Sequence, residues 1–205
     1  MGFLSASASF TRYRIIEEIP DTLWPEIADR LRRNAFKDID HTADERSFGW
    51  VAFDDMLDAD WRTAPPQKGE FITMGLRLDT RRIPPAVFKK HLTLALAGEM
   101  ERMEQTKGKA YVSRDRKNEL KEQTRLRLMA RTLPIPAQFD VVWNTGSGVV
   151  YLASIQGKLR ALFEDMFTMT FDLHLEPMTP YYQALARMGE ERASVLDDLE
   201  PTVFV

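Results

Sequence analysis

The sequence predicts an α+β fold, an antiparallel β-sheet body with packed helices and a protruding helical hairpin arm. Short runs of alternating or β-branched residues predict strands in both halves of the chain. Between them, an apolar helical repeat fills residues 83–106 and a charged segment of helix-forming composition fills residues 113–130. We therefore expect an α+β body of two β-rich blocks, residues 1–82 and 134–205, and an arm of residues 83–133.

The first β-rich block is expected to contain three strands and one helix. Residues 7–16 alternate small or polar with larger side chains, which predicts a strand. Asp21 is expected to cap a helix that carries Pro25 in its first turn. The sequence then predicts two further strands, over residues 48–53 and 70–78, separated by a loop rich in Asp and Pro.

The arm is expected to be a pair of helices. The first opens at residues 83–85 and shows apolar side chains at three- and four-residue steps, so one of its faces should be packed. Gly108 permits the chain to leave this helix. Ser113 is a good N-cap for a second helix, which should run to Ala130 before the prolines at 134 and 136 force an extended conformation.

The second β-rich block repeats the mixture of strands and helices. Residues 139–143 and 149–153 flank a turn with two glycines, which is typical of a β-hairpin. Ser154 is expected to cap the helix that follows. A strand over residues 172–176 and a short helix over residues 180–188 complete the pattern.

Charge is distributed unevenly along the chain. Residues 107–131 hold nine Lys or Arg against three Asp or Glu, a local charge of +6, although the whole chain carries −3. Residues 77–131 sum to +8, so the remainder sums to −11. Such asymmetry indicates an anionic partner.

Composition excludes several classes of protein. The absence of cysteine excludes disulfides and Cys-ligated zinc or iron–sulfur sites. His41, His91 and His174 are scattered, and neither a metal-binding HExxH motif nor a Ser–His–Asp arrangement is recognisable, so we predict no catalytic residue, metal or cofactor. No apolar run reaches the roughly 20 residues of a membrane span, and no signal peptide is recognisable, which favours a cytoplasmic protein.

A stripe of basic residues on the second arm helix is the main candidate site. At 100° per residue its members fall within an arc of about 80° and could follow the phosphates of a nucleic acid. The stripe consists of Arg114, Lys117, Lys121 and Arg125. Arg131 could bind the backbone separately. The alternative interpretation is an ordinary solvated helix, since Glu119 and Glu122 dilute the charge.

No recognisable motif for reading bases accompanies the stripe, so binding is expected to ignore sequence. Only Tyr111 offers an aromatic ring near the basic residues, which favours duplex DNA over single strands as the partner.

An acidic loop is the alternative site. Asp54, Asp55 and Asp58 could hold Mg²⁺ for an exonuclease, because such enzymes use clustered carboxylates. The competing interpretation is a solvated loop, since nuclease carboxylates usually come from several strands. A third hypothesis is a protein-interaction regulator whose arm mediates dimerisation.

The order of four segments resembles the bacterial RdgC family of recombination-associated DNA-binding proteins, also labelled exonucleases. Residues 48–51, FGWV, are similar to the family's MGWV, and residues 83–89, IPPAVFK, to its LPSPVIK. After the charged arm, residues 139–143 and 148–152 are similar to its TMMWID and GLIMVD strands. The resemblance covers residues 7–177, and the family's chains continue further at the C-terminus.

This resemblance implies a nucleoid-associated, ring-like homodimer that encloses duplex DNA without sequence preference and restrains RecA-driven strand exchange. By position it implies that the basic stripe faces the DNA, with Lys89 and Lys90 as further contacts. Arg131 corresponds to the arginine of the family's LLPRAF segment.

Overall fold

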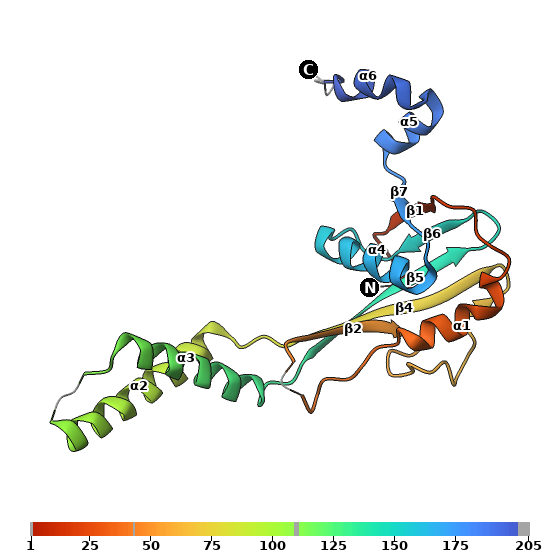
Figure 1. The fold of residues 1–205 in the computed structure, drawn as a ribbon. Coiled ribbons are helices and arrows are strands. Elements are labelled where there is room, and N and C mark those ends of the chain that lie inside the picture. The colour runs from red at the N-terminus through yellow and green to blue at the C-terminus, as the bar shows by residue number, and fades with distance from the viewer. Residues whose placement is uncertain (1, 43, 109–110, 201–205) are drawn as a thin grey trace. The chain divides into compact units, whose positions relative to one another are not determined.

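The computed structural model describes residues 2–42, 44–108 and 111–200, which form a seven-stranded antiparallel sheet and six α-helices (Figure 1). This confirms the predicted α+β fold. The strands are β1 Thr11–Ile15, β2 Arg46–Val51, β3 Gln67–Lys68, β4 Phe71–Thr80, β5 Ile135–Asn144, β6 Val149–Leu152 and β7 Leu175–Pro177. The helices are α1 Leu23–Arg33, α2 Pro85–Lys107, α3 Arg114–Met129, α4 Gly157–Phe171, α5 Pro180–Met188 and α6 Ala193–Asp197, with a 3₁₀ turn at Glu190–Arg192.

The chain divides into two compact units. The first comprises residues 1–35, 49–76 and 138–205, and the second comprises residues 36–48 and 77–137. The predicted arm lies wholly within the second unit. No helix in the described ranges is long and apolar enough to cross a membrane.

The strand order is β2-β4-β5-β6-β1-β7, with β3 paired to β4. Val150 of β6 lies opposite both Tyr13 of β1 and Trp143 of β5. Directly paired residues share one face of a sheet, so these three side chains form a row across three strands. All three are fully buried.

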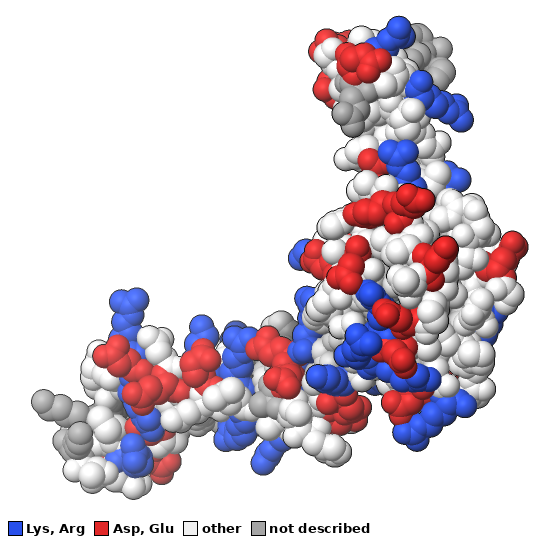
Figure 2. All heavy atoms as spheres, turned by 45° about the vertical axis from the view of Figure 1, so that its right-hand side comes forward, with Lys and Arg blue, Asp and Glu red and all other residues white. Residues whose placement is uncertain are grey.

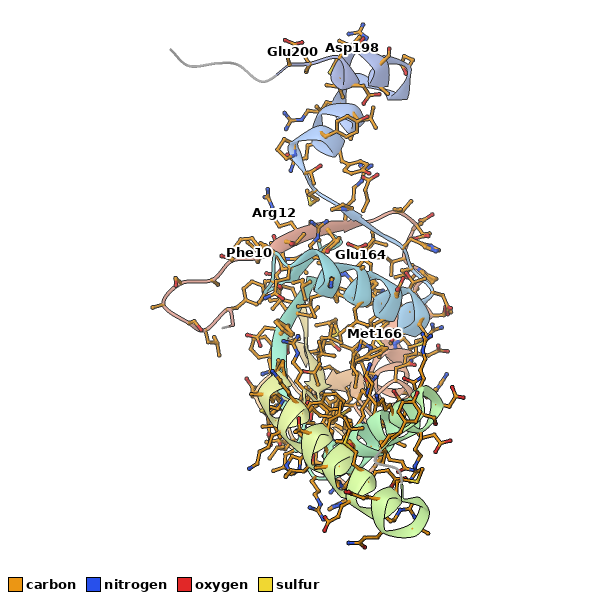
Figure 3. All side chains as sticks on the ribbon, turned by 90° about the vertical axis from the view of Figure 1, so that its left-hand side faces the viewer. Phe10, Arg12, Glu164, Met166, Asp198 and Glu200 are labelled. Atoms are coloured by element: carbon orange, nitrogen blue, oxygen red, sulfur yellow. The ribbon has the colours of Figure 1, made fainter. Side chains whose placement is uncertain are left out.

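Helices α1 and α4 cover the face of the first unit that carries this row (Figure 1). The Trp143 ring contacts Phe167 and Phe171 of α4, each at 5.5 Å between centroids. Trp50 donates from Nε1 to the Thr170 hydroxyl at 2.8 Å, which satisfies a buried indole N–H. Met166, labelled in Figure 3, lies on the buried side of α4. This aromatic core holds α4 against the sheet in the first unit.

The second unit contains the helical hairpin, in which α2 packs against α3. As predicted, Gly108 ends α2 in the left-handed conformation at φ 63°, and its N–H donates to the Glu104 carbonyl. The Ser113 hydroxyl accepts the Arg116 N–H and caps α3. Leu120, Thr124 and Leu128 recur every four residues and are buried. These three side chains form the packed face of α3.

Three local predictions are wrong. Thr22, not Asp21, precedes α1, and it makes no side-chain cap, because its backbone is already helical at φ −66° and ψ −18°, whereas a capping residue adopts an extended conformation. Gln156, not Ser154, is the N-cap of α4. Asp172 does not start a strand: at φ 59° it ends α4, and its N–H donates to the Thr168 carbonyl at 2.8 Å.

Candidate nucleic-acid interface

The second unit concentrates positive charge. Its residues include 17 Lys or Arg and 11 Asp or Glu, a formal charge of +6, whereas the first unit carries −9. Figure 2 shows that both basic and acidic side chains occur along the hairpin. The distribution of ion pairs therefore decides which cations remain available to a ligand.

Three members of the predicted stripe are exposed on α3 without a carboxylate partner. Among the described residues, no Asp or Glu oxygen lies within 4.0 Å of the charged groups of Arg114, Lys117 or Lys121. The Lys117 ammonium lies 6.0 Å from the centre of the Tyr111 ring. These three cations are free to meet phosphates.

Arg125, the fourth member, forms an ion pair with Glu45. Their side chains are 49% and 57% exposed, so the pair lies at the surface. Exposed pairs contribute little to stability, about 0.2–1 kcal/mol. Glu45 therefore competes with any phosphate for the Arg125 guanidinium, but the guanidinium remains accessible.

Arg116 lies outside the predicted stripe and is committed to the fold. Its guanidinium donates to Glu99 of α2 at 3.0 Å and to Glu119 at 2.7 Å. Arg102 also pairs with Glu99 at 2.8 Å. The hydrogen bonds that Glu99 accepts from Arg116 and Arg102 lower its pKa, and those that Arg116 donates to Glu99 and Glu119 raise the pKa of Arg116. This cluster joins the two arm helices. Glu99 and Arg116 are 17 residues apart in the chain, and no pattern in the sequence predicted that they pair.

The remaining predicted cations are exposed but lie elsewhere. Lys89 and Lys90 belong to the second turn of α2, and Arg131 follows the end of α3 in a turn. No ion pair involves these three side chains in the described part of the chain. None of the three belongs to the stripe on α3.

A groove of about 420 Å³ adjoins the C-terminal half of the stripe. Lys121 and Arg125 line it from α3, and Phe88 lines it from α2. The groove is also lined by the buried Arg81, whose terminal nitrogens donate to four backbone carbonyls of residues 39–44. Arg81 thus fixes the loop that brings Glu45 to Arg125, a structural role that the sequence did not reveal.

The carboxylates of the acidic loop bind other groups of the same chain. The Asp58 carboxylate accepts the backbone N–H groups of Asp60, Arg62 and Thr63, and the bond from Thr63 is the largest cause that lowers its pKa to about 2. Asp54 pairs with Lys68. Within the described ranges, no group of three or more His, Cys, Asp or Glu could hold a metal ion. The carboxylates of this loop hold its conformation.

Neither the scan against models of protein families nor the search of curated proteins found a match to this chain. The resemblance to the RdgC family remains a prediction from sequence.

Proposed function

We propose that this protein binds duplex DNA without sequence preference, through contacts between the phosphate backbone and α3. Arg114, Lys117 and Lys121 are the primary contacts, and Arg125 joins them when it leaves Glu45. Lys89 and Arg131 supply flanking charge. The resemblance to RdgC supports extending this proposal to a nucleoid-associated role in recombination, in which bound protein restrains strand exchange.

The observation that carries the proposal is the row of three exposed, unpaired cations on one face of α3. The buried Leu120–Thr124–Leu128 face holds the helix, so the row is ordered before a ligand arrives. An ordered row of point charges suits a polymer with regularly spaced phosphates. Nothing in the described residues favours nuclease chemistry, since the carboxylates of the acidic loop serve the fold.

The test is a fluorescence-anisotropy titration with two unrelated 20-base-pair duplexes at 50 and 200 mM salt. Each duplex phosphate contact contributes about 0.9 to the slope of log K against log salt, so three contacts weaken binding about 40-fold across this range. Replacing Arg114, Lys117 and Lys121 by Gln should remove most of that dependence. Arg12→Gln, an exposed change in the first unit, is the matched control. An unchanged slope in the triple variant refutes the proposal.

We further propose that the DNA-binding form is a homodimer assembled through the outward face of α2. Val87, Lys90, Leu94, Gly98 and Glu101 fall within an arc of about 80° on this helix. Leu94 is 59% exposed, and a Cβ at Gly98 would meet nothing within 4 Å. An antiparallel second copy would set Leu94 against Gly98 and Lys90 against Glu101, so the face is complementary to itself.

Sedimentation equilibrium without DNA tests this interface. Lys90→Glu and Glu101→Lys should each weaken association, and the double variant should restore it, because the swapped charges again face each other. Lys89→Glu, which lies off this face, serves as the control. A monomer at all salt concentrations, or a double variant weaker than both single variants, contradicts the proposed interface.

A further inference from the structure

A hollow of about 320 Å³ lies beside the N-terminal end of α3. Met103 and Val112 give it apolar lining, the guanidinium groups of Arg102 and Arg116 give it planar cations, and Tyr111 gives it an aromatic wall. Val112 is buried and Met103 half-buried, so the apolar part is set into the hairpin. Apolar lining with a few placed polar groups is typical of ligand sites.

Tyr111 is unusual for its exposure and its surroundings. Its side chain is 68% exposed, although it neighbours the buried Val112. A single exposed tyrosine is ordinary on a protein surface. This ring, however, borders a hollow, and the Lys117 ammonium lies 6.0 Å from its centre. The free cation Arg114 follows three residues later in the chain.

The charge of the hollow suits a neutral ring more than a phosphate. Its one carboxylate, Glu99, is bound by both Arg102 and Arg116, so neither guanidinium is free to clamp an anion. Guanidinium planes and aromatic rings both stack on nucleobases. The unpaired cations Lys117 and Arg114 do not line the hollow, so their charge remains available to a phosphate next to a base held there.

We propose that this hollow holds one unpaired nucleobase, stacked on Tyr111, while Lys117 and Arg114 bind the adjoining phosphates. A base within a duplex is covered on both faces, whereas a base in an overhang, gap or fork can enter. The inference rests on the proposed function and adds a substrate class to it: duplex DNA with a single-stranded end or interruption. The stripe binds the duplex part, and the hollow selects the unpaired base.

The experiment compares a blunt 20-base-pair duplex with the same duplex bearing a five-nucleotide 3′ overhang, by fluorescence anisotropy at 100 mM salt. The wild-type protein should bind the overhang DNA more tightly. Tyr111→Ala should raise the Kd for overhang DNA by about 5- to 150-fold, the effect expected for loss of one stacked base, and change the blunt-duplex Kd less than about twofold. Tyr111→Phe should retain wild-type binding because it keeps the ring. Leu126→Ala, another exposed position on α3, should change neither Kd.

A second readout reports the stacking itself. With 2-aminopurine as the overhang base, wild-type protein and Tyr111→Phe should change its emission in the same way, and Tyr111→Ala should not. Blunt-duplex binding without any preference for the overhang overturns this inference and leaves the proposed function intact. Equal losses for both DNAs in Tyr111→Ala also overturn it, since Tyr111 would then support the fold or Lys117. Absence of binding to either DNA overturns the proposed function as well.

Discussion

The proposed function predicts that replacing Glu45 by Gln increases the affinity for duplex DNA. In the wild-type protein Arg125 is paired with Glu45, so a phosphate must displace a carboxylate before this guanidinium can take part. The two side chains are about half exposed, and an exposed pair of this kind is worth about 0.2–1 kcal/mol. Removing the competitor should therefore lower the Kd by about 1.5- to 5-fold at 50 mM salt. The newly available contact should also steepen the salt slope by up to about 0.9.

The assay is the anisotropy titration with a 20-base-pair duplex at 50, 100 and 200 mM salt. The decisive control is the same substitution in an Arg125→Gln background, where Glu45 has no guanidinium to release. If Glu45 acts through Arg125, the double variant should bind as Arg125→Gln does. An equal gain in both backgrounds would show instead that Glu45 repels DNA at long range. No gain in either would refute the assignment of Arg125 to the interface.

Three predictions concern the stability of the fold. Arg81→Met should lower the free energy of unfolding by about 2–4 kcal/mol in urea titrations, because the backbone carbonyls that Arg81 binds, that of Ile39 buried and the others part-buried, lose a charged donor. The exposed Arg82→Met should have little effect, and equal effects would contradict this role of Arg81. Asp58→Asn should lower the thermal midpoint at pH 7. Since folding lowers the pKa of Asp58 from 3.8 to about 2, its carboxylate contributes stability above pH 3.8 and loses it as the pH falls through 2, so the gap between variant and wild type should close in acid. Gly75→Ala should destabilise the sheet by about 1–3 kcal/mol, since its Cβ would lie 2.7 Å from the Gln138 amide nitrogen; unchanged unfolding in urea would show that this side chain moves aside.

Local chemistry was enough to predict the helical hairpin. The αL-forming Gly108 and the hydroxyl of Ser113 act within their own turns, so the ends of α2 and α3 follow from neighbouring residues. The same reasoning failed at Asp172. An aspartate that begins an alternating segment is compatible with a strand, but it also tolerates the left-handed conformation, and the packed last turn of α4 selected the latter.

The pairing of charges could not be predicted in the same way. The helical spacing put Arg114, Lys117, Lys121 and Arg125 on one face, but it could not show that only Arg125 has a carboxylate partner. Glu45 is 80 residues from Arg125 in the chain, and their contact depends on how the 39–44 loop is held by Arg81. Tertiary contacts of this kind carry no periodicity, so no pattern in the sequence could reveal them.

The position of each ion pair also explains how one helix could serve two kinds of contact. Arg116 is drawn to the buried Glu99 and joins α3 to α2, so its charge stabilises the hairpin and is withdrawn from the surface. Lys117 and Lys121 have no such partner in the described residues, and their charge stays available to a polyanion. If every cation of α3 were paired, the helix would be held in place but would have no free charge for a polyanion. If none were paired, the ion pair between α3 and α2 would be missing. Because the two classes occupy different sides of α3, the phosphate contacts can be removed without removing the bond that holds the helix, and the effect on DNA binding can be measured on a folded protein.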